Sequence, residues 1–71
     1  MHLVYSEHAI KRMKQRGITQ FEIEELLKYP EIIRKSFGER KEAIGVIRNK
    51  RIKIKFIEKE NYIIIITLLT K

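Results

Sequence analysis

The sequence predicts an α+β domain in which two N-terminal helices pack on one face of an antiparallel β-sheet, in the order β-α-α-β-β-β-β. Two consecutive sets of helix-end signals lie within residues 5–22. From Glu31 onward the apolar pattern changes from a helical period to a period of two, which is typical of strands. The chain has 71 residues, of which 44% are apolar and 35% charged, so we expect a single domain over residues 1–71.

The first predicted elements are a short edge strand at Leu3–Tyr5 and a helix that begins after Ser6. The Ser6 hydroxyl can accept from the free amides of the first turn, and Gly17 can take the left-handed conformation that ends a helix. At about 100° per residue, one helix face carries a polar stripe beside a buried arc. The stripe holds His8, Arg12 and Arg16. The buried arc is predicted to hold Ala9, Ile10 and Met13.

The second predicted helix follows at once. Thr19 and Glu22 have the spacing of a capping box, in which each side chain accepts from the backbone amide of the other residue. The helix is predicted over Gln20–Lys28, and it must stop before Pro30. Its buried face is predicted to hold Ile23, Leu26 and Leu27.

The rest of the chain predicts four strands of a meander. The first two are predicted at Ile32–Phe37 and Glu42–Arg48, joined by a turn at Gly38–Glu39. Gly45 inside the second strand indicates a β-bulge. A two-residue hairpin connection is predicted at Asn49–Lys50.

The last two strands differ in pattern. In the first, the residues predicted to be buried are Ile52, Ile54 and Phe56. Lys53, Lys55 and Ile57 alternate with them and point to the other face. The run Tyr62–Leu69 is apolar on both faces, so we place it in the interior of the sheet.

The charge distribution favours a polyanionic partner. The formal net charge is +7, and four cations against Glu7 give residues 1–18 a charge of +3. Residues 19–30 carry −2 and residues 31–71 carry +6, so the first helix and the sheet are basic while the second helix is acidic. Such a surface attracts nucleic acid, although a high charge also serves solubility alone.

Several classes of protein are disfavoured. The chain has no cysteine, which excludes disulfides and thiolate metal sites. The apolar runs are far shorter than the ~20 residues that span a bilayer, and no secretory leader opens the chain, so we expect a cytoplasmic protein without membrane contact. With only His2 and His8 as histidines, we expect no metal site and no cofactor.

The string Tyr-Ser-x-His-Ala-x-x-Arg-Met-x-x-Arg-Gly-Ile-Thr at residues 5–19 resembles a small bacterial and archaeal family. The resemblance continues through Tyr29-Pro30-Glu31, a glycine-punctuated hairpin sheet and Thr67. That family is similar to compact members of the RelE/ParE toxin superfamily, close to the BrnT toxins. The resemblance implies a RelE-like domain that acts as a metal-independent endoribonuclease or inhibits another essential process. It also implies an antitoxin protein encoded beside it.

The positions that match the motif and lack a purely structural explanation are His8, Arg12 and Arg16. In RNA cleavage, the imidazole would transfer the proton of the 2′-hydroxyl or of the leaving oxygen. The two guanidinium groups would hold the phosphate and stabilise its transition state. The structural alternatives are a solvated or sheet-bonded imidazole, arginines paired with an acidic residue and, for Arg16, a favourable charge at the C-terminus of the helix. The acidic candidates are Glu22, Glu25 and Glu42.

A second basic group is expected to help bind RNA, including messenger RNA on the ribosome. It comprises Lys11, Arg48, Arg51, Lys53 and Lys55. Lys53 and Lys55 are predicted to line a surface beside the helix stripe, helping it to hold the RNA backbone. The alternative is a solvated sheet face that lysines protect from edge pairing. Tyr5 and Tyr62 could stack on bases or pack in the sheet. A second function hypothesis keeps the basic surface without catalysis, as a module that binds nucleic acid or an acidic protein.

Overall fold

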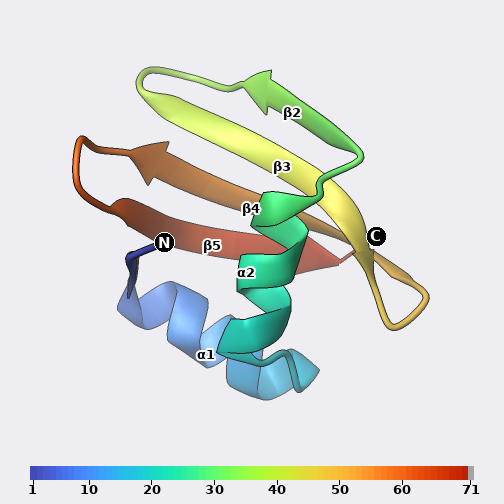
Figure 1. Cartoon of the computed structure of the whole chain (residues 1–71). Helices are drawn as coiled ribbons and strands as arrows, with labels where there is room; N and C mark the ends of the chain where they lie inside the picture. The colour runs from blue at the N-terminus through green and yellow to red at the C-terminus, as the bar shows by residue number, and fades with distance from the viewer. Residues whose placement is uncertain (71) are drawn as a thin grey trace.

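The computed structural model describes residues 1–70 as a five-stranded sheet with two helices on one face (Figure 1). The elements are β1 (Leu3–Tyr5), α1 (Glu7–Arg16), α2 (Gln20–Lys28), β2 (Ile32–Lys35), β3 (Arg40–Ile47), β4 (Lys50–Glu58) and β5 (Ile63–Thr70). The predicted α+β class and element order are confirmed. No helix within residues 1–70 is both long and apolar enough to cross a membrane.

The strand order is β1-β5-β4-β3-β2, so the sheet is mixed and not antiparallel throughout. β1 pairs in parallel with β5, from Leu3 opposite Ile63 to Tyr5 opposite Ile65. The other three pairings are antiparallel. Both helices and the strands β2, β3 and β4 lie between β1 and β5 along the chain. β5 therefore lies between two strands, as its apolar character predicts.

The end signals of α1 are confirmed. Ser6 is the N-cap, and its hydroxyl accepts from the Ala9 amide at 2.9 Å. Gly17 is left-handed at φ 66°, and the Ile18 amide donates to the Met13 carbonyl in a Schellman-type ending.

The buried arc of α1 is narrower than predicted. Ala9 and Met13 are buried, but Ile10 is 42% exposed, so its predicted burial is wrong. Ile10 lies about 60° further round the helix than Met13, beyond the strip that contacts the sheet.

The second helix matches its prediction closely. It spans Gln20–Lys28, and the capping box of Thr19 and Glu22 has both of its hydrogen bonds. Of the three predicted core residues of α2, Ile23 and Leu26 are buried and Leu27 is half-buried against the same cluster.

Both backbone irregularities lie elsewhere than predicted. The β3–β4 turn consists of Arg48 and Asn49, at φ 49° and 67°, one residue earlier than expected. Two successive positive φ values are the mark of the type I′ hairpin turn. The β-bulge predicted at Gly45 is absent, since Gly45 pairs regularly with Ile52. The register shift lies in β5, where Ile66 is the extra residue opposite Lys55 and Phe56.

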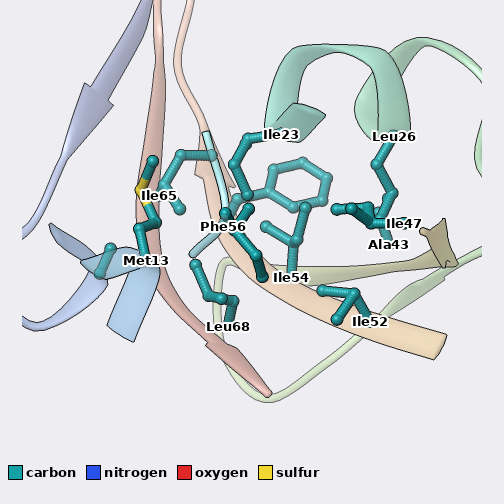
Figure 2. Packing of buried hydrophobic residues seen from close by; sticks show 12 residues of the cluster. Met13, Ile23, Leu26, Ala43, Ile47, Ile52, Ile54, Phe56, Ile65 and Leu68 are labelled. Carbon is teal, nitrogen blue, oxygen red and sulfur yellow. The ribbon is translucent and has the colours of Figure 1, made fainter. Parts of the chain in front are cut away.

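The core lies between the helices and one face of the sheet. Figure 2 shows Phe56 and Ile54 of β4 beneath Ile23 of α2, with Leu68 beside them. Gly45 lets α2 approach β3 closely, because a Cβ atom there would lie 2.9 Å from Cγ of Leu26. The glycine is therefore required by packing, not by a bulge.

Replacing Gly45 with Ala should destabilise the fold by about 1–3 kcal/mol, because the added methyl group overpacks the contact with Leu26. The measurement is the free energy of unfolding in urea. A double-mutant cycle with Leu26→Ala is the control, since removing Cγ should reduce the cost of Gly45→Ala. An equal cost in both backgrounds would contradict this account.

Candidate functional site

The predicted stripe on α1 is open to solvent. His8 and Arg16 are exposed, and Arg12 is half-buried. Four cations share this helix, namely Lys11, Arg12, Lys14 and Arg16. None of them forms an ion pair with a carboxylate of residues 1–70. α1 therefore presents charge that the described part of the protein does not neutralise.

The carboxylates proposed as alternative partners of these arginines are occupied elsewhere. Glu22 pairs with Arg48 at 2.8 Å. Glu25 lies 3.9 Å from Lys28, and Glu42 lies 2.9 Å from Arg34. The salt-bridge alternative for Arg12 and Arg16 is therefore wrong among these residues.

The three stripe residues follow one another at intervals of four. A rise of 1.5 Å per residue separates His8 from Arg12 by about 6 Å along the axis, and from Arg16 by about 12 Å. Side chains one turn apart can meet at one phosphate, whereas those two turns apart serve different phosphates. His8 makes no hydrogen bond within residues 1–70, so its imidazole is solvated, as one alternative proposed.

Lys53 and Lys55 do not extend this stripe, and the prediction that they line a surface beside it is wrong. Their neighbours Ile52, Ile54 and Phe56 are buried beneath the helices. Because side chains alternate along a strand, the two lysines point from the opposite face of the sheet. The basic group of β4 and the stripe of α1 are therefore separated by the thickness of the sheet.

On that opposite face, the lysines surround one carboxylate. Glu42 is only 7% exposed and accepts a hydrogen bond from Arg34 Nε at 2.9 Å. Lys55 Nζ lies 3.7 Å and Lys53 Nζ 4.0 Å from its two oxygens. The Arg34 hydrogen bond holds the pKa of Glu42 below its usual value, with further lowering by Lys53 and Lys55 and an opposing effect of burial. These lysines stabilise an otherwise costly buried charge.

Two further cations of the predicted group are also paired. Arg51 lies 2.9 Å from Glu31. Arg48 donates to the Gly17 carbonyl, and its Nε lies 2.8 Å from Glu22. Hydrogen bonding from the Thr19 backbone, followed by the nearby charge of Arg48, lowers the pKa of Glu22. Arg48 thereby ties the β3–β4 hairpin to the turn between the helices.

A cleft of about 390 Å³ opens where α1 ends beside this hairpin. It is lined by Gln15, Arg16, Ile18, Ile47, Arg48, Lys50, Ile52 and Thr70. It brings Arg16 and Arg48 together with Lys50, which sequence analysis did not single out. Lys50 directly follows the hairpin turn, so correct placement of that turn would have drawn attention to it. Like Arg16, it has no ion pair within residues 1–70.

Tyr5 is held in the fold. Its ring packs against the core cluster, and burial raises the pKa of its hydroxyl, with a smaller effect of the Glu24 carboxylate. Of the two tyrosines proposed to stack on bases, only Tyr62 is exposed. No three potential metal-ligating side chains of His, Cys, Asp or Glu gather within residues 1–70.

The family described as a domain of unknown function, DUF4258, matches residues 5–69. The chain belongs to this family. The matched region includes both helices, strands β2 to β4, all of β5 except Thr70 and nearly all of the cleft lining, but only the last residue of β1. No curated protein and no solved structure matches the chain.

The buried carboxylate gives this DUF4258 domain a predictable response to acid. Since the folded-state pKa of Glu42 is lowered, its stabilising contribution is complete above the unfolded-state pKa of about 4.3 and is lost as pH falls through the folded-state value. Wild type should therefore lose more stability than Glu42→Gln between pH 7 and pH 3. Urea unfolding at both pH values measures this difference.

The matched control is Glu60→Gln, which alters an exposed residue without an ion pair in the described chain. It should lose stability in parallel with the wild type. Parallel losses in wild type and Glu42→Gln would show that Glu42 is not responsible.

Proposed function

We propose that this DUF4258 domain binds single-stranded RNA along α1 and cleaves it without a metal, as the cytoplasmic toxin component of a toxin–antitoxin pair. The observation that carries the proposal is the unequal pairing of charges. The cations of the β3–β4 hairpin that were expected to help bind RNA all pair with carboxylates, whereas the four cations of α1 pair with no carboxylate within residues 1–70. The paired hairpin cations are Arg48, Arg51, Lys53 and Lys55.

Unpaired cations in a row suit a polyanion. Each cation that neutralises a phosphate releases counterions condensed on the RNA, which favours binding at low salt. A guanidinium group also bonds two phosphate oxygens at once, which a solvated lysine does not. Arg12 is half-buried, so its side chain has less freedom to lose on binding than a fully exposed one.

His8 and Arg12 form the proposed reactive pair, because they lie one helical turn apart. The 2′-oxygen of the RNA forms a bond to the adjacent phosphorus, and the bond from phosphorus to the 5′-oxygen breaks. Neutral His8 accepts the 2′-hydroxyl proton, while the leaving oxygen takes a proton from solvent. Arg12 stabilises the charge on the phosphorus-bound oxygens. The products are a 2′,3′-cyclic phosphate and a 5′-hydroxyl.

A second candidate function is binding without catalysis. It is favoured by the solvated state of His8, whose imidazole has no hydrogen-bond partner within residues 1–70 to orient it. In that case the same surface holds RNA, or an acidic protein, without reacting.

The proposed antitoxin partner has an edge of the sheet available to it. β1 pairs only with Ile63–Ile65, so the remainder of β5 has no strand neighbour on that side among residues 1–70. An extended segment of a partner could add there as a further strand.

If His8 transfers the proton, His8→Ala should lower the cleavage rate by about 10²–10⁴-fold and leave RNA affinity nearly unchanged. The measurement combines single-turnover cleavage in EDTA, on free and ribosome-bound RNA, with binding by fluorescence anisotropy. Growth of cells expressing the wild type or His8→Ala gives a parallel readout.

The matched control is His2→Ala, which changes an exposed histidine outside α1. It should cleave like the wild type. Absence of cleavage by the wild-type protein, with RNA binding intact, would reject the nuclease and favour the binding module.

If α1 holds the RNA backbone, Arg12→Gln should reduce the slope of log affinity against log salt by about one, independently of RNA sequence. Arg40→Gln is the matched control, since Arg40 is an exposed, unpaired arginine of the described chain at the end of β3 far from the cleft. Equal slopes for the two variants would contradict a specific role for α1.

A further inference from the structure

We infer that the cleft at the end of α1 is a second phosphate-binding subsite, which holds a nucleotide of the bound RNA two helical turns from His8. The inference rests on the proposed function, because it assigns the RNA a path from the His8–Arg12 pair to the cleft. It adds Lys50 as a binding residue and predicts a minimum substrate length.

The composition of the cleft fits a nucleotide better than a bare anion. Its floor consists of the buried side chains of Ile18, Ile47 and Ile52. Its polar groups include two unpaired cations, Arg16 at the end of α1 and Lys50 at the start of β4. The lining surface is more polar than apolar, which suits a phosphorylated ligand, and about 390 Å³ lies within the usual size of sites that take an organic ligand. The ribose or base would contact the floor, and the phosphate would lie between the cations.

An anion at the C-terminal end of a helix ordinarily meets the negative end of the helix dipole. Here some of the carbonyls at the end of α1 already accept hydrogen bonds. The Met13 and Lys14 carbonyls accept from the amides that follow, and the Gly17 carbonyl accepts from Arg48. The guanidinium of Arg48 thus places positive charge beside the negative end of the dipole, which weakens the repulsion of a phosphate there.

Arg48 is itself partly neutralised by Glu22, at 2.8 Å. We therefore assign it a positioning role, because it fixes the hairpin against the turn between the helices. The charge available to the ligand comes from Arg16 and Lys50, which have no ion pair within residues 1–70.

The distance along α1 sets the length of the ligand. Arg16 lies about 12 Å beyond His8 in helical rise, more than one phosphate can bridge. An RNA that occupies both places must extend over several nucleotides, because a dinucleotide bound at the His8–Arg12 pair does not extend to the cleft. Affinity should therefore increase with length until the cleft is occupied.

The test compares Lys50→Gln and Arg16→Gln with wild type on RNA oligonucleotides of two and six nucleotides, in EDTA. The affinity for the hexanucleotide should fall by about tenfold for each variant, while Lys50→Gln should leave the rate of dinucleotide cleavage at the His8–Arg12 pair unchanged. Lys35→Gln and Arg40→Gln are the matched controls, since they remove exposed, unpaired cations of the described chain outside the cleft. A uniform loss on both lengths, or no loss on either, would overturn the inference.

A second arm uses no RNA, so that it can succeed or fail apart from the proposed function. Ribose 5-phosphate is titrated into ¹⁵N-labelled protein, and the amides of Arg48, Asn49 and Thr70 should shift in wild type but much less in Lys50→Gln. Absence of these shifts would overturn the subsite even if RNA binds. Shifts with no RNA binding would overturn the proposed function and the RNA assignment, and identify a site for small phosphorylated sugars. Shifts from inorganic phosphate alone, equal in size, would overturn the nucleotide assignment.

Discussion

The Ser6 side chain fixes the position of α1 on the sheet, and the geometry of the candidate site depends on it. Its hydroxyl accepts from the Ala9 amide at 2.9 Å and donates to the Ile66 carbonyl at 2.6 Å, while its own amide donates to Ile65. Ile66 is the bulged residue of β5, just beyond the end of β1. The bulge thus supplies the acceptor that a helix cap uses, and one residue sets both the start of α1 and its place along β5.

With α1 fixed, the distribution of carboxylates determines which cations remain free. Glu42 gathers Arg34, Lys53 and Lys55 on the face of the sheet without helices. Glu22 pairs with Arg48, and no carboxylate within residues 1–70 forms an ion pair with a cation of α1. A net charge of +7 alone describes a protein attracted to any polyanion. Among residues 1–70, the pairing pattern leaves five of the seven unpaired lysines and arginines on α1 and in the cleft at its end, and the other two are Lys35 and Arg40.

The sequence predicts the local parts of this structure well, because their causes are local. Both caps, the ends of α2 and the alternation along β4 depend on residues within one turn or one strand. The parallel pairing of β1 with β5 was not predicted, since it depends on where sixty residues of chain return. The wrong placement of Lys53 beside the helix stripe is different, because the same alternation that buries Ile54 under the helices already requires Lys53 on the other face.

The cleft was not predictable because it depends on the position of one turn. A turn at Asn49–Lys50 would leave Arg48 in the strand, paired and extended. At φ 49°, Arg48 instead takes the left-handed conformation, which costs a non-glycine residue roughly 1–2 kcal/mol. Its contacts with the Gly17 carbonyl and the Glu22 carboxylate offset that cost. The same shift makes Lys50 the first residue of β4, opposite Ile47 and inside the cleft. A turn that the pattern misplaced by one residue therefore provides both the wall of the cleft and one of its two free cations.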